Sequence, residues 1–312
     1  TDYLLVAGGH RHTIVGGLNT VRVDNFGKTE VIDTIIPDWN IGTSTGGIGV
    51  TGIGAHRVWA DDKFVYSIEN KVGLKTYSVD ADGKFQLIDT WESTSQLYNV
   101  YGDGKFVYVA SAIQSYPNSA TVEVLYADAD GKLTHLKQNI VEERQFSNTT
   151  VPWVHHALWA NERHVYVSTG LPNDSRGVTR IFSVNDCGEF DLQGSYGLGV
   201  DDITNAVTTI RGDKNFVYFV CGYGAGSLLV FKETDGVLEE LSTGVDITSD
   251  AYQPTDLWCD DKFVYTLHSH PGTDTVLPSQ TWHGDCIKTW TIDDAGVLTL
   301  KDAHQPVSAG SN

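Results

Sequence analysis

Short runs of alternating apolar and polar residues, separated by polar turns, recur along the chain. The clearest run spans residues 59–66, Trp-Ala-Asp-Asp-Lys-Phe-Val-Tyr, and predicts a strand, a tight turn and a second strand. Copies stand at residues 101–108, 159–166 and 258–265, and a looser copy with one inserted residue is predicted at 210–218. Self-similarity at regular spacing is typical of repeat proteins, so we expect a series of similar folded units.

A second pair of strands follows each run, joined by a turn that ends in glycine. Around Gly83, apolar and polar residues alternate over 74–79 before the turn and 85–88 after it, the period of half-buried strands. Each unit is therefore predicted to hold four short antiparallel strands, which we call a, b, c and d. The turn glycines are Gly27, Gly83, Gly131, Gly188, Gly236 and Gly296.

Four-stranded units repeated at roughly fifty residues are typical of a β-propeller, in which each unit is one blade. The predicted units are 1–53, 54–94, 95–152, 153–201, 202–251 and 252–312. No long amphipathic helix and no linker interrupts them. The sequence thus predicts an all-β fold, with residues 1–312 as a single domain, a six-bladed β-propeller.

The first unit is incomplete, because it opens at strand b with residues 3–6. The tail 306–312 falls where the next strand a would begin. Pairing of the two termini in one blade would remove an exposed sheet edge, so we predict that the C-terminus supplies the innermost strand of the first blade. A propeller of seven blades is the alternative.

The formal net charge of −19 disfavours nucleic acid and anionic membranes as partners, because both would be repelled at long range. No apolar run reaches the ~18 residues of a membrane-spanning helix. We expect a soluble protein that acts on a small molecule as a monomer or weak oligomer. Its compartment stays open, since either a cytoplasmic protein or a processed, secreted one fits the sequence.

Histidines collect in one class of loop. In a propeller, the loop before strand a and the loop between strands b and c open on the same face, and eight of the 11 histidines map there. Such imidazoles could bind a metal or serve as a general base near neutral pH, whereas the plainer alternative is loop histidines bonded to backbone or water. The eight residues are His10, His12, His56, His155, His156, His268, His270 and His283.

Ring closure would bring His10 and His12 near His268 and His270. We expect these four to form the metal site if one exists, with Zn, Cu, Fe or Ni as the candidate ions. A central Ca²⁺ site, with oxygen ligands from four blades, ranks lower because no EF-hand-like or Asp-rich loop supports it. Those oxygen ligands would be Glu69, Asn99, Asn205 and Asp256.

The stretch Val154-His-His-Ala-Leu-Trp159, followed by residues 164–167, resembles the lactonase-type propeller family. This family includes 6-phosphogluconolactonase-like proteins and carboxymuconate-cyclising enzymes, and its repeats read like PRHxxFSPDGKYLYVVNE. His156 matches the motif His, and Glu69 matches the motif Glu. Departures are the blade count, since the family normally has seven, and the Ser-Pro-Asp-Gly turn, which is replaced here.

The resemblance implies an enzyme at the channel mouth, with lactonase-like hydrolysis as the expected reaction. In this hypothesis His56 or His156 is the general base, and Glu69 or Asp256 orients it or acts as the acid. The alternative is a non-catalytic propeller that binds a ligand or a protein through the same face. The residues expected to bind substrate are Arg57, which would hold a carboxylate, together with Asn99, His155 and Asn205.

Overall fold

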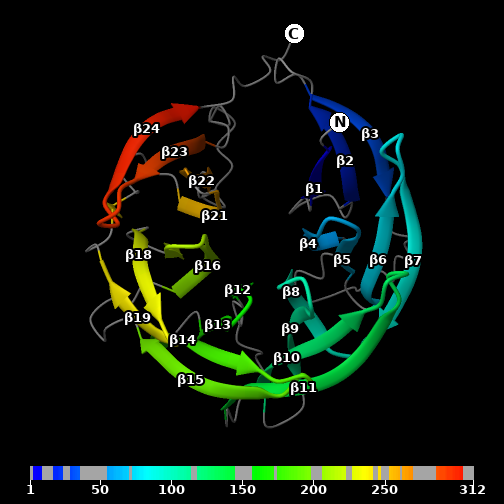
Figure 1. The fold of residues 1–312 in the computed structure, drawn as a ribbon, viewed down its shortest axis with the longest axis horizontal. Coiled ribbons are helices and arrows are strands. Elements are labelled where there is room, and N and C mark those ends of the chain that lie inside the picture. Colours follow the sequence, from blue (N-terminus) through cyan, green and yellow to red (C-terminus); the bar gives the residue numbers. More distant parts are fainter. Residues whose placement is uncertain are drawn as a thin grey trace, which may run out of the picture. The chain divides into compact units, whose positions relative to one another are not determined.

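The structure is a computed structural model of the chain, and every element in it is a β-strand (Figure 1). No helix long and apolar enough to span a membrane is found among the described residues. The structure describes residues 3–8, 17–23, 29–35, 55–69, 72–113, 118–144, 157–171, 174–197, 206–222, 227–241, 245–246, 253–260, 262–269 and 286–304.

The strands form six antiparallel sheets, each with strands in chain order. The first sheet contains β1 (Tyr3–Gly8), β2 (Gly17–Val23) and β3 (Thr29–Ile35). The second contains β4 (Ala55–Ala60), β5 (Val65–Glu69), β6 (Gly73–Val79) and β7 (Phe85–Glu92). The third contains β8 (Gln96–Gly102), β9 (Val107–Ile113), β10 (Asn118–Ala127) and β11 (Leu133–Arg144).

The fourth sheet contains β12 (Ala157–Ala160), β13 (Val165–Leu171), β14 (Asp174–Val184) and β15 (Phe190–Gly197). The fifth contains β16 (Ala206–Gly212), β17 (Val217–Gly222), β18 (Ser227–Thr234) and β19 (Val237–Glu240), and β20 (Val245–Asp246) also pairs with β18. The sixth contains β21 (Gln253–Cys259), β22 (Phe263–Ser269), β23 (Cys286–Ile292) and β24 (Leu298–His304).

Each sheet falls inside one of the predicted units, and the described part of the first sheet has three strands, as the missing strand a implies. The tail that was predicted to complete it lies outside the described residues. By contacts the chain divides into two compact units, one of residues 1–151 with 184–190, the other of 152–183 with 191–312. The single domain therefore stays a prediction.

The repeated polar turn is held by its aspartate. Asp61 Oδ1 accepts the backbone N–H groups of Lys63 and Phe64, both at 2.8 Å, and Oδ2 accepts the Tyr66 hydroxyl at 3.2 Å. This side chain closes the turn and ties it to the buried tyrosine of strand b. The same three bonds are made by Asp103, Asp213 and Asp260 in the third, fifth and sixth sheets.

The prediction of an inserted residue in the fifth copy is wrong. Tyr66 pairs with Trp59, and Tyr218 pairs with Arg211, so the two turns have the same length. Asp213 occupies the same position in its turn as Asp61, Asp103 and Asp260 do in theirs. Arg211 stands where the second, third, fourth and sixth sheets have an aromatic residue. Every position before the turn in the fifth sheet consequently shifts by one.

A one-residue bulge interrupts strand a at the same place in four sheets. In β4 it lies between Ala55 and Arg57, so His56 is the extra residue. Bulges re-aim side chains and are common next to active sites. The other extra residues are Tyr98 in β8, Thr208 in β16 and Thr255 in β21.

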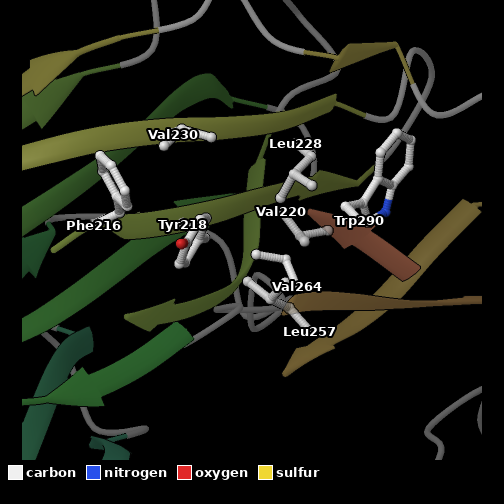
Figure 2. Packing of buried hydrophobic residues seen from close by; sticks show 8 residues of the cluster. All are labelled: Phe216, Tyr218, Val220, Leu228, Val230, Leu257, Val264 and Trp290. Atoms are coloured by element: carbon white, nitrogen blue, oxygen red, sulfur yellow. The ribbon is translucent and has the colours of Figure 1, made fainter. Parts of the chain in front are cut away.

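Within each of the two compact units that the contacts define, neighbouring sheets bury apolar faces against one another. In the first unit, Ile68 and Leu74 of the second sheet pack with Val109 and Leu125 of the third, and all four are fully buried. In the second unit the fifth and sixth sheets share a cluster that includes Tyr218 (Figure 2). Close packing of this kind fixes the ends of the strands, where the candidate site lies.

Glycines in the c–d turns allow neighbouring sheets to approach one another closely. Gly131, in the c–d turn of the third sheet, has φ of +81°, and a Cβ there would lie 2.8 Å from a ring carbon of Phe64 in the second sheet. Only glycine combines this backbone conformation with so close an approach. The predicted c–d turn glycines 83, 131, 188, 236 and 296 all have positive φ, and Gly27 lies outside the described residues.

Candidate functional site

The candidate site lies at the end of each sheet where strand a begins and strand b finishes, which we call the b–c end. Three residues after the repeated tyrosine, strand b carries a different functional group in each of the second to sixth sheets. All five groups are buried. They are Glu69 (3% exposed), Ser111 (0%), Thr169 (2%), Cys221 (1%) and His268 (0%).

Glu69 contacts two partners from strand β6. Lys75 Nζ lies 2.7 Å from Glu69 Oε2, and the Tyr77 hydroxyl donates to Oε1 at 3.2 Å. Burial, followed by the Glu69 carboxylate, raises the pKa of Tyr77, which therefore stays a donor. This arrangement fits an orienting carboxylate better than a general acid, because the negative charge is already neutralised by Lys75.

The third sheet places a different network at the equivalent position. Ser111 Oγ lies 2.6 Å from Thr121 Oγ1 and donates to Glu123 Oε1 at 3.0 Å. Glu123, 2% exposed, also accepts Gln138 Nε2 at 2.6 Å and lies 2.9 Å from His135 Nε2. The buried carboxylate is thus satisfied entirely within its own sheet.

In the second, third and fourth sheets, the residue three positions after the tyrosine of strand b bonds to a charged residue of strand c. The fifth sheet has neither the polar residue on strand b nor the charged residue on strand c. Arg180 Nη1 donates to Thr169 Oγ1 at 3.1 Å in the fourth sheet, matching Glu69 with Lys75 and Ser111 with Glu123. The fifth sheet has Cys221 opposite a strand c that carries Leu229 in the charged position. A polar residue at this position of strand b therefore occurs together with a charged residue on strand c.

His268 lies within strand β22, not in the loop that the sequence predicted. Its Nε2 lies 2.8 Å from Thr266 Oγ1, which also accepts Trp290 Nε1 at 3.0 Å. Among the described residues no group of three or more metal-ligating side chains occurs, and His10, His12 and His270 lie outside them.

Asp256 is the most open of the candidate acids. It follows the bulge in β21, its side chain is 39% exposed, and Oδ1 accepts the N–H of Leu257 at 2.9 Å. Asn99 follows the bulge of β8, makes the same bond to Val100 and is 7% exposed. A half-exposed carboxylate at a strand end can accept a proton from water, whereas the buried amide of Asn99 is better suited to shaping the strand.

The structure brings together four of the predicted residues in the first unit. Ala55 pairs with Glu69, so the bulged His56 and the following Arg57 stand beside the strand end that carries Glu69. Arg57 is exposed, as a substrate-binding cation would need to be. Asn99 lies on β8, the strand a of the adjacent third sheet, and β4 contacts β8. The side chain of His56 and all of His155, His156 and Asn205 lie outside what the structure describes.

Sequence reasoning missed the charged column on strand c. Its members lie opposite the residue that follows the buried tyrosine of strand b, a position that period-two alternation alone does not mark as special. Aligning the copies on the turn aspartate would have revealed it. The column consists of Lys75, Glu123, Arg180 and Lys288, with Leu229 in the fifth sheet.

No known family model and no curated protein matches the sequence. Solved structures do match. A protein from Lactobacillus plantarum is 18% identical with a TM-score of 0.66, covering 96% of this chain and 81% of its own. A candidate 6-phosphogluconolactonase from Bacteroides uniformis is 16% identical with a TM-score of 0.67, covering 98% and 84%.

The periplasmic gluconolactonase of Pseudomonas aeruginosa is 12% identical with a TM-score of 0.54, covering 97% of this chain and 96% of its own. Identities this low show the fold alone. The fold is that of the lactonase-type β-propellers, built from four-stranded antiparallel blades, as the sequence resemblance implied.

Proposed function

We propose that the protein is a lactonase-like hydrolase that opens a small lactone to its hydroxy acid at the b–c end of the sheets. Water adds to the lactone carbonyl as a base takes its proton, and the ring oxygen leaves with a proton. The observation that carries the proposal is the buried Glu69–Lys75 pair directly beside the bulged His56. The names of the matching structures support it as an analogy of fold.

In this proposal His56 is the general base, Glu69 orients its imidazole, and Arg57 binds the carboxylate of substrate or product. Arginine suits that role because its planar guanidinium donates two parallel hydrogen bonds to a carboxylate. Asn99 shapes the adjacent end of β8. In the second unit, His156 is the alternative base and Asp256 the alternative orienting group or acid, with His155 and Asn205 as substrate contacts.

A panel of γ- and δ-lactones, followed by proton release at constant pH, tests the proposal. We expect hydrolysis of at least one lactone well above the spontaneous rate. The variants H56Q and H156Q then decide between the two bases, since only the true base should be needed. A wild-type protein that hydrolyses no lactone would refute the proposal.

Metal assistance is a separate part of the proposal. His10, His12, His268 and His270 would hold one divalent ion, which could polarise the lactone carbonyl. Elemental analysis of the purified protein tests this. One Zn, Cu, Fe or Ni per chain, lost in H268N, is the result expected of a metal enzyme, and a metal-free active protein would contradict it.

The second candidate is a propeller that binds a ligand or protein without catalysis. The observation that favours it is the variety of the strand b ends, because different groups on a common scaffold also suit recognition. A retained hydroxy acid without turnover of its lactone would support this candidate. For the fold, we propose six blades, since four four-stranded sheets, one five-stranded sheet and one three-stranded sheet leave no strands for a seventh among the described residues.

A further inference from the structure

Opposite the tyrosine of strand b, strand a carries an aromatic residue in the second, third, fourth and sixth sheets. The exception is the fifth sheet, which has Arg211 there. Trp59 and Trp159 pair with the buried tyrosines of strand b and cover a glycine of the next sheet. A Cβ at Gly102 would lie 2.3 Å from Trp59, and one at Gly212 would lie 2.4 Å from Trp159. Tryptophan at this position therefore requires glycine in the following sheet.

The fifth and sixth sheets replace both partners at once. Arg211 stands where Trp59 and Trp159 stand in the second and fourth sheets, and the sixth sheet has Cys259 in the place of the glycine. Burial and Asp213 raise the pKa of the Cys259 thiol to about 12, while the guanidinium of Arg211 lowers it. Arg211 Nη2 also lies 4.0 Å from Asp256 Oδ1, which places the cation against the sixth sheet.

Three groups converge on Asp256, the candidate acid of the sixth sheet. Besides the N–H of Leu257, its Oδ1 accepts Thr209 Oγ1 at 3.5 Å and lies 4.0 Å from Arg211 Nη2. Thr209 and Arg211 both come from β16, two residues apart, so one strand supplies both contacts from outside the sheet of Asp256. The Arg211 side chain is only 18% exposed, which limits solvent screening of the pair.

We infer that Arg211 is a positioning residue, which holds the Asp256 carboxylate in one orientation at the b–c end. The inference rests on the proposed function in its alternative form, in which Asp256 is the orienting group or acid. Arginine stays protonated at every physiological pH, so the field it exerts on Asp256 is constant. Arg211 also donates Nη1 to the carbonyl of Ile210 at 2.8 Å, which fixes the guanidinium itself.

The fold offers a matched test, since the double variant R211W/C259G rebuilds the tryptophan–glycine pair of the other sheets. We expect it to fold with a thermal midpoint near that of wild type, while kcat falls by about tenfold or more and KM changes little. R211K, which keeps the charge but not the planar fork, should fall between. An R211W/C259G protein that is folded and has wild-type kcat would overturn the inference.

A second readout does not depend on turnover. In protein labelled with ¹³C-aspartate, the carboxyl resonance of Asp256 is identified by its loss in D256N. It should shift in both R211K and R211W/C259G and stay in place in W258F, a neighbour whose side chain is 61% exposed. If wild type hydrolyses no lactone, the proposed function fails while this shift still supports the pair. An unmoved resonance in both Arg211 variants refutes the inference.

Discussion

Lys75 and Glu69 form a salt bridge of 2.7 Å between neighbouring strands of the second sheet, with 19% and 3% of their side chains exposed. A buried carboxylate needs a partner of opposite charge, so the Glu69 side chain depends on Lys75. The pair stands at the strand end beside the bulged His56, where the proposed function places an orienting group.

Removal of one partner of this pair should cost far more than removal of both. We expect K75M to lower the free energy of unfolding by about 3 kcal/mol, because it strands a buried charge, and the double variant E69Q/K75M to lose less. Urea unfolding at neutral pH measures both. Equal losses in the single and double variants would mean that the two charges are not coupled.

Two turn glycines with similar φ differ in how closely a neighbouring sheet approaches them, so alanine substitutions at the two positions can be compared. G131A adds a Cβ 2.8 Å from Phe64 at a φ of +81°, whereas G104A adds one at a φ of +88° with nothing within 4 Å. Both carry the ~1 kcal/mol of a left-handed residue, but only G131A also crowds the neighbouring sheet, by a further 1–3 kcal/mol or so. Thermal unfolding compares them, and G104A should be clearly the milder change.

Acid should weaken the polar turns. The backbone N–H groups of Lys262 and Phe263 lower the pKa of Asp260 below its ordinary 3.8. A carboxyl with a depressed folded-state pKa stabilises the fold above its unfolded pKa, and this stability is lost as pH falls through the folded value. Wild type should therefore lose stability as the pH falls below about 4.

The variant D260N isolates this effect, because asparagine makes the same two backbone bonds in the fourth sheet through Asn161. We expect a shallower decline of stability with acid in D260N than in wild type, measured by urea unfolding at several pH values. Identical slopes would show that Asp260 is not among the carboxylates responsible.

The sequence was sufficient for the sheets, because each strand pair is bracketed by a polar turn and a glycine. It misplaced the register of the fifth sheet since Arg211 broke the aromatic pattern on which the copies were aligned, whereas Asp213 kept its place. Alternation shows which residues share a face, but not that the carboxylates of Glu69 and Glu123 lie buried there.

The central claim is that His56, beside the Glu69–Lys75 pair, drives lactone hydrolysis at the b–c end. The most direct test compares kcat/KM for the best lactone in wild type, H56Q and D62N, where Asp62 is an exposed residue of a polar turn. We predict a loss of about 100-fold or more in H56Q and none in D62N. Hydrolysis by folded H56Q at the wild-type rate would contradict the claim.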